Sequence, residues 1–276
     1  MEFALADPVE TAPDDPPERR RRRWPFVVGA VFAVLAGVAI TAVIILREST
    51  TPVDVEQAVS DFRSGGGTVE RIASALPDPG VYTYSTSGRE SVDALDGRHH
   101  DYPAVTTITV RPEGCGVKFT WRPLVERFDD TVLCPDPSGV VLPRYRSHHE
   151  FFGMDDDREF ICEPGSFWYP AATEPGSTWT VRCASDDVDV LRTGTITGLS
   201  DVEVGGETIE VLTFELHDEI SGASVGTNER VVTVVPGNGL LVELAASVDV
   251  RSGSAIGDVH YLELYRLRLT SLTPRL

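Results

Sequence analysis

The chain has 276 residues, of which 43 are acidic and 24 are lysine or arginine, and its net charge is −19. This excess of acid repels phosphate backbones and excludes nucleic acid as a partner. Hydrophobic residues make up 41% of the chain, which excludes disorder over most of the length, and the length suits one or two domains.

The first 46 residues predict a tail and a membrane span. Residues 1–23 are rich in acids and prolines, end in the basic run Arg19 to Arg23, and are expected to form a disordered cytoplasmic tail. Residues 24–46 carry no charge, and at about 1.5 Å per residue they are long enough to cross the hydrocarbon layer as a transmembrane helix. The arginines before the span place the N-terminus in the cytoplasm and residues 47–276 outside. The competing interpretation, a cleaved secretory signal, has a shorter apolar region and a small-residue cleavage site.

Small residues recur every four positions within this span. Gly29, Ala33, Gly37 and Thr41 share one stripe, which lets a second helix approach closely and predicts self-association. The alternative is that these residues are simply common in membrane helices.

Residues 47–78 are expected to form a short helical stalk or lid. Thr51, Pro52 and Asp54 are typical of a helix start. A second short helix is expected from Thr68 to about Leu76, before two prolines. The simpler alternative is a spacer that lifts the next domain off the bilayer.

Residues 79–276 have the two-residue periodicity of strands. Phe119 and Trp121, for example, alternate with polar neighbours, and turn residues separate the apolar runs at Gly205-Gly206 and from Pro236 to Gly239. About ten strands predict a mainly β fold, either a curved antiparallel sheet or an incomplete β-barrel, with a β-sandwich as the second choice.

Two strands have unusual apolar patterns. In Tyr261 to Leu269 the apolar face switches phase after Leu264, which predicts a bulge or strong curvature. In Ile209 to Leu216 both faces are apolar, which predicts that each side of the sheet is covered, partly by the helices before residue 76 and partly by a bound apolar molecule.

The cysteines predict disulfides, because an even number of them lies outside the membrane. We expect Cys115 to pair with Cys134 and Cys162 with Cys183, since neighbour pairing closes short loops. No two cysteines have the spacing of a zinc ribbon.

No catalytic residue or cofactor site is predicted, because no nucleophile, phosphate-loop or dinucleotide motif is present. His148, His149 and Glu150 are the best candidates for a metal site, but neighbouring residues of a strand point to opposite faces, so no metal is expected. On the strand interpretation, His149 lies on an apolar face. The run Asp155 to Asp157 is expected to be a solvated turn.

Several segments resemble a family of uncharacterised actinobacterial membrane proteins. They are Gly80 to Tyr84, the Gly-Cys-Gly turn at Cys115, Tyr145 to Gly153, and Gly176 to Cys183. The resemblance covers nearly all of residues 79–276 and implies no activity. The strand and turn rhythm of the later part is also similar to the half-barrel sheets of lipoprotein-carrier (LolA-like) domains.

The sequence therefore predicts a single-pass bacterial membrane protein whose β domain lies outside the cell membrane. The first hypothesis is a non-enzymatic binding or carrier module for an apolar envelope molecule. The second is an adaptor for another envelope protein, and the third is a hydrolase with an unrecognised site.

Overall fold

The computed structural model describes residues 50–65, 76–94, 97–254 and 257–276. The expected tail, the membrane span with its small-residue stripe, and most of the second short helix lie outside these residues. Within them, no helix has the length and apolar character needed to cross a membrane. Residues 48–276 form a compact unit with their own core and both disulfides, so this part has what it needs to fold by itself.

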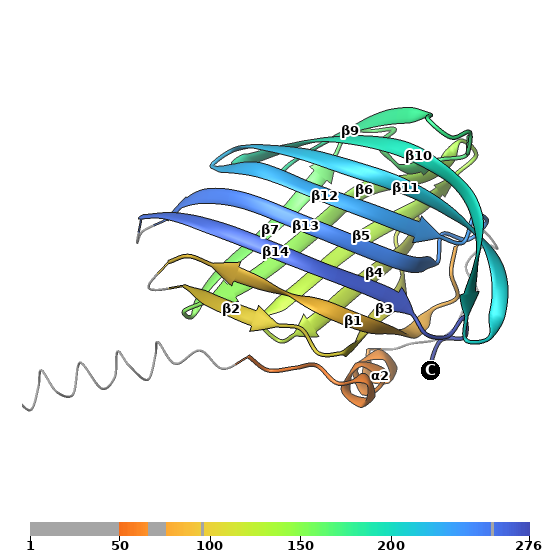
Figure 1. Cartoon of the computed structure of the whole chain (residues 1–276), viewed down its shortest axis with the longest axis horizontal. Coiled ribbons are helices and arrows are strands. Elements are labelled where there is room, and N and C mark those ends of the chain that lie inside the picture. The colour runs from red at the N-terminus through yellow and green to blue at the C-terminus, as the bar shows by residue number, and fades with distance from the viewer. Residues whose placement is uncertain (1–49, 66–75, 95–96, 255–256) are drawn as a thin grey trace, which may run out of the picture. The chain divides into compact units, whose positions relative to one another are not determined.

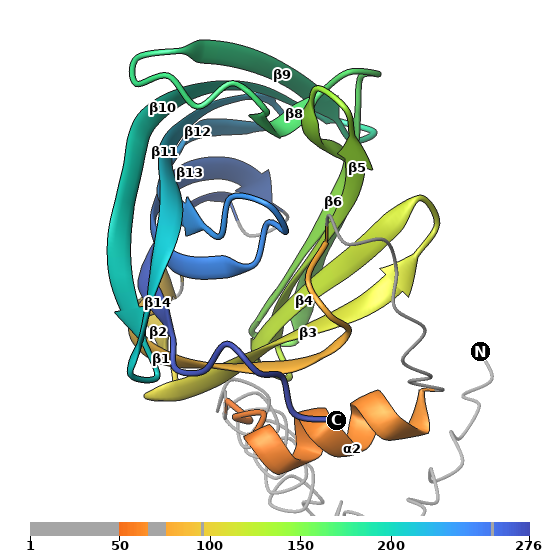
Figure 2. The same cartoon turned by 90° about the vertical axis from the view of Figure 1, so that its right-hand side faces the viewer.

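The β domain is an antiparallel barrel closed by pairing between its first and last strands (Figures 1 and 2). The ring follows the order β1-β3-β4-β5-β6-β7-β9-β10-β11-β12-β13-β14, while β2 pairs with β1 and β8 with β6 outside it. The predicted β class is confirmed, but the barrel is not incomplete and the β-sandwich alternative is wrong. The strands are β1 (Gly80–Val92), β2 (Arg98–Asp101), β3 (Val105–Glu113), β4 (Gly116–Leu124), β5 (Arg127–Asp136), β6 (Gly139–Phe151), β7 (Met154–Cys162), β8 (Phe167–Pro170), β9 (Thr178–Ala184), β10 (Val188–Val204), β11 (Glu207–Gly222), β12 (Ser224–Val234), β13 (Leu241–Ser254) and β14 (Gly257–Leu269).

Four strands were not expected from the sequence: β2, β5, β7 and β8. The acidic run Asp155 to Asp157 belongs to β7 and pairs with the end of β6, so its assignment as a turn is wrong. The turn lies just before it, where Phe152 and Gly153 have φ values of 57° and 69°. The alternation in β7 is hidden because its inward positions Asp156 and Arg158 are charged, like its outward face.

Both faces of β11 carry buried apolar residues close to an irregularity in its ladder with β10. The ladder between β10 and β11 shifts register between Ile196 and Gly198. Phe214 lies on one side of the shift and Leu212 and Val211 on the other, and all three are buried in the main core. Residues from both faces of β11 therefore belong to one core cluster.

The phase switch in β14 is not a bulge. Its ladders with β13 and β1 run without a register shift. Tyr265, Leu267 and Leu269 point inward, and so does Glu263, whereas Leu264 is 65% exposed on the outside. A charged residue therefore occupies an interior position of a regular strand.

The helix α2 (Val55–Ser64) lies on the outer face of the barrel. It begins at Asp54, whose side chain accepts a hydrogen bond from the amide of Gln57, and not at Thr51 as expected. Val59 and Phe62 pack against Val81 in a cluster separate from the main core. The expectation that this helix covers the concave face is wrong.

The weakest junction in the ring is the one between β7 and β9. These strands share only the pairs Ile161–Ala184 and Cys162–Cys183. The second pair is also a disulfide, so a covalent bond reinforces this junction. The other disulfide, Cys115–Cys134, joins β4 and β5, which already share a longer ladder. Both expected pairings are confirmed.

We predict that the two disulfides differ in local effect although each stabilises the fold by about 3 kcal/mol. Replacing Cys162 and Cys183 by alanine in fragment 48–276 should expose the junction of β7 and β9 to amide hydrogen exchange. Replacing Cys115 and Cys134 should lower the free energy of unfolding similarly and leave that junction protected. Equal exchange at Ile161 and Ala184 in the two variants would contradict this prediction.

Candidate functional site

The interior of the barrel holds a cavity of about 490 Å³. This volume lies within the range of about 300–1,000 Å³ that is usual for small-molecule sites. Its wall combines apolar side chains with two groups of charged residues. The apolar part includes Val92, Phe151, Val190, Val248, Val250 and Val259.

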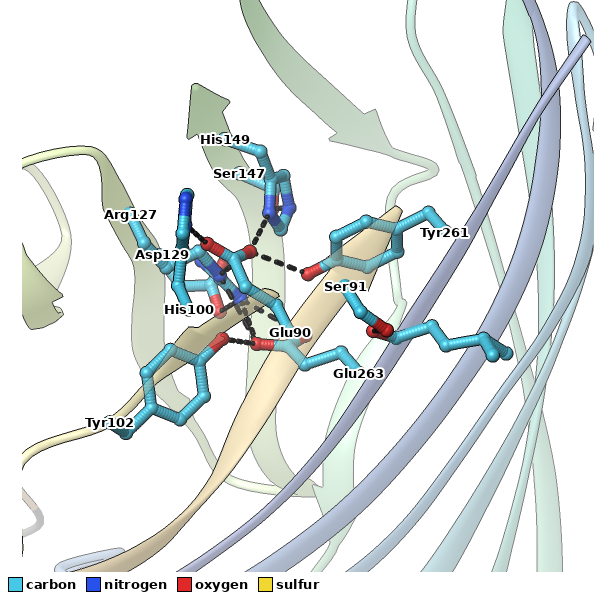
Figure 3. Close-up of polar contacts among 11 residues, drawn as sticks. Glu90, Ser91, His100, Tyr102, Arg127, Asp129, Ser147, His149, Tyr261 and Glu263 are labelled. Carbon is cyan, nitrogen blue, oxygen red and sulfur yellow. Dashed lines mark hydrogen bonds and ion pairs between the residues drawn. The ribbon is translucent and has the colours of Figure 1, made fainter. Parts of the chain in front are cut away.

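The first charged group is centred on Glu90 of β1 (Figure 3). The side chain of Glu90 is 0% exposed. One carboxylate oxygen lies 2.8 Å from Nδ1 of His100. The other lies 2.9 Å from Nδ1 of His149 and accepts a hydrogen bond of 2.9 Å from the hydroxyl of Tyr261. Two of these partners come from β2 and β14, which pair with β1, and the third comes from β6, which is not a neighbour of β1 in the ring.

Arg127 of β5 crosses the interior beside Glu90. Its guanidinium donates to both oxygens of Glu263 at 3.1–3.3 Å and to Asp129 at 2.7 Å. It also lies 3.7 Å from Glu90 and 5.3 Å from the centre of the Trp121 ring. A buried cation of this kind needs such partners, because leaving it unpaired is costly.

The two buried glutamates have pKa values displaced in opposite directions. Burial by itself would raise the pKa of Glu90, but hydrogen bonds from His100 and His149 together with the charge of Arg127 outweigh burial and lower the pKa from 4.5 to about 2. At Glu263 burial outweighs the attraction of Arg127 and raises the pKa. Environments that move the pKa values of two neighbouring carboxyl groups apart are typical of functional sites.

His149 also contacts a hydroxyl. Its Nε2 atom lies 2.9 Å from Oγ of Ser147, so Ser147, His149 and Glu90 form a line of hydrogen-bonded groups. With a carboxylate at Nδ1, the neutral imidazole carries its proton there and presents Nε2 as an acceptor. Ser147 also lies opposite Asp129 in the ladder between β5 and β6.

The second charged group lies on three neighbouring strands, β10, β11 and β12. Arg192 donates to both oxygens of Asp218 at 2.7 and 3.0 Å, and Arg230 donates to the same carboxylate at 2.6 Å. All three residues line the cavity.

The candidate metal residues do not converge. His149 faces the interior and Glu90, whereas His148 stacks on Phe128 with ring centres 4.8 Å apart. Glu150 pairs with Asp155 in the ladder between β6 and β7. Within the part of the chain that the structure describes, no cluster of three or more histidine, cysteine or acidic side chains is arranged to hold a metal ion.

Most of the charged residues in the cavity were not singled out by the sequence analysis. Some of them, such as Glu263 in β14, occupy inward positions on strands whose other inward residues are mostly apolar, and this pattern is the signal that was available. His149 was placed on an apolar face, but its closest contacts there are Glu90, Ser147 and Tyr261.

Comparison with known proteins does not assign a family. No protein-family model matches the chain, and no curated protein matches it. A solved structure, the hypothetical lipoprotein YmcC from Escherichia coli K12, is similar over 74% of this chain and 94% of its own, with 11% identity and a TM-score of 0.31. A TM-score this low carries no argument, and the resemblances drawn from the sequence stay predictions.

We predict that Glu90 makes stability depend on acid pH. Because its folded pKa is lowered to about 2 from 4.5, its contribution is complete above the higher value and is lost as the pH falls toward the lower one. The full contribution is on the order of 3 kcal/mol. In fragment 48–276, the difference in unfolding free energy between the unchanged protein and Glu90→Gln should narrow between pH 6 and pH 3.

The matched control is Glu215→Gln, which changes an exposed glutamate on the outer face of β11. Denaturant titrations at each pH should give a nearly constant difference for this variant. A constant difference for Glu90→Gln as well would contradict the lowered pKa.

Proposed function

We propose that the barrel is a binding or carrier module that holds a small apolar or amphipathic molecule of the cell envelope in its interior. The observation that carries this proposal is the cavity of about 490 Å³ inside a closed sheet. An interior packed solid by its own side chains would leave no room for a ligand.

The composition of the wall supports an amphipathic ligand. Val92, Phe151 and Val259 form an apolar cluster at one part of the wall, and Val190 and Val248 contribute to others. Apolar contacts supply most of the binding free energy at such sites, while a few polar groups fix orientation. The charged groups around Glu90 and Arg192 line the same cavity and would fix the orientation of the ligand.

An extracytoplasmic location is part of the proposal. The two disulfides fit an oxidising compartment. The arginine run before residues 24–46 favours a single-pass anchor with a cytoplasmic N-terminus. Self-association through Gly29, Ala33, Gly37 and Thr41 would then bring two barrels together on one membrane.

An adaptor for another envelope protein would use the outer face instead. Leu262 and Leu264 are 43% and 65% exposed there. We rank this function second, because Arg266 follows on the same face of β14 and isolated exposed leucines are common on protein surfaces.

Ester hydrolysis is a further candidate, favoured by the line of Ser147, His149 and Glu90. In that reaction Oγ of Ser147 would attack the carbonyl carbon while Nε2 of His149 takes the hydroxyl proton and later gives it to the leaving alkoxide. Water would then release the acid from the serine. Asp129 lies opposite Ser147 in the ladder and offers a second acceptor for the same hydroxyl proton, which ranks hydrolysis below binding.

We predict that filling the cavity abolishes binding of an apolar probe. Val248→Trp places a large side chain in the interior, whereas Ser247→Trp places the same side chain on the outside of β13. Fragment 48–276 should bind the neutral fluorophore N-phenyl-1-naphthylamine, and Val248→Trp should weaken that binding at least tenfold. Circular dichroism checks that each variant is folded. Equal binding by the two variants, or none by the unchanged fragment, would contradict the proposal.

For hydrolysis, the corresponding prediction concerns covalent labelling. A fluorophosphonate probe should label the unchanged fragment and Ser224→Ala, which alters another serine of the cavity wall, but not Ser147→Ala. Mass spectrometry of the labelled peptide gives the modified residue. A fragment that resists the probe is not a serine hydrolase.

A further inference from the structure

The charged group of Arg192, Asp218 and Arg230 contains more positive than negative charge. Two guanidinium groups share one carboxylate, which accepts from Arg192 at both oxygens and from Arg230 at one. The side chains of Arg192 and Asp218 are 2% and 4% exposed, and that of Arg230 is 13% exposed. The group therefore carries one uncompensated positive charge inside the barrel.

Some hydrogen-bond donors of this group have no acceptor. Among the described residues, neither Nη1 of Arg192 nor Nε of Arg230 has a hydrogen-bond partner. Burial, and next the neighbouring charge of Arg192, lower the pKa of Arg230. A buried cation without a counter-charge is unfavourable, and an anion brought to it would relieve that cost.

Aromatic rings hold the two arginines in place. The guanidinium carbon of Arg192 lies 5.6 Å from the ring centres of both Tyr145 and Trp168, and that of Arg230 lies 5.7 Å from Trp168. Such contacts fix the position of a cation without neutralising it. The arginines are thus ordered before any ligand arrives, which lowers the entropic cost of binding.

The other charged group of the cavity has the opposite balance. There Arg127 faces three carboxylates, those of Glu90, Asp129 and Glu263. An anionic ligand would be repelled at that wall and attracted at the wall formed by β10, β11 and β12. The interior is therefore polarised, and it favours one orientation of a ligand with a charged end.

We propose that the ligand of this cavity is an amphiphile with an anionic head, a long-chain carboxylate or an alkyl phosphate, whose head contacts Arg230 and the Arg192–Asp218 pair. Its chain lies along the apolar wall of Val190, Val248 and Val250. Arg230 is the residue that distinguishes this ligand from a neutral one, because removing it leaves Arg192 and Asp218 as a matched pair. This inference rests on the proposed binding function and specifies its ligand class.

The test compares charged and neutral ligands of equal chain length on fragment 48–276. Dodecanoate and dodecyl phosphate, each below its critical micelle concentration, and dodecanol, below its solubility limit, are titrated against bound N-phenyl-1-naphthylamine. We expect dodecanoate or dodecyl phosphate to bind at least tenfold more tightly than dodecanol, and the better of the two identifies the head. This comparison needs no variant, so it is decisive even if a variant fails to fold.

Variants of Arg230 then locate the head. Arg230→Met should weaken binding of the better anion at least tenfold, which corresponds to about 1.4 kcal/mol, and leave dodecanol binding unchanged. Arg230→Lys should retain most of the preference. Arg266→Met, which removes an exposed arginine on the outer face of β14, should change neither.

The outcomes separate this inference from the function on which it rests. Equal binding of the anions and dodecanol, or an equal loss of both in Arg230→Met, would overturn the anionic head and leave apolar binding intact. Failure of N-phenyl-1-naphthylamine and all three dodecyl ligands to bind would overturn the binding function itself, and this inference with it.

Discussion

The contact between Arg127 and Glu263 sets the character of the interior. These residues lie on β5 and β14, which are not neighbours in the ring, so the ion pair spans the inside of the barrel. With Glu90 and Asp129 it forms a polar zone that keeps the main apolar core apart from the small cluster around Phe151. The side chains of such an interior have to pair the buried charges as well as exclude water, so the cavity wall contains both charged and apolar residues.

Ten of the strands and the turns at Gly205-Gly206 and from Pro236 to Gly239 could be predicted from the sequence, but the other four strands and the closure of the ring could not. Alternation of apolar and polar residues says which face of a strand is buried. It does not say which strand lies beside it, and the pairing of Tyr84 with Leu269 joins residues from opposite ends of the domain. The disulfides were predictable because they join cysteines that are neighbours in sequence.

The candidate site was hidden for a related reason. A charged residue at an inward position breaks the apolar pattern of its strand, as Glu263 does in β14 and Arg192 does in β10. The apparent phase switch after Leu264 was the visible trace of this site. It was interpreted as a backbone irregularity, since a buried carboxylate is the less common explanation until its partner Arg127 is known.

The junction between β7 and β9 links the fold to the chemistry of its surroundings. Elsewhere a ladder of hydrogen bonds holds each strand to the next, but here the Cys162–Cys183 bond does much of that work. A chain whose thiols stay reduced would tend to present two free strand edges, and free edges recruit other β chains into aggregates. Formation of the Cys162–Cys183 bond thus covers strand edges that would otherwise pair with other chains. The time at which the chain reaches an oxidising compartment therefore determines how long these edges stay exposed to aggregation.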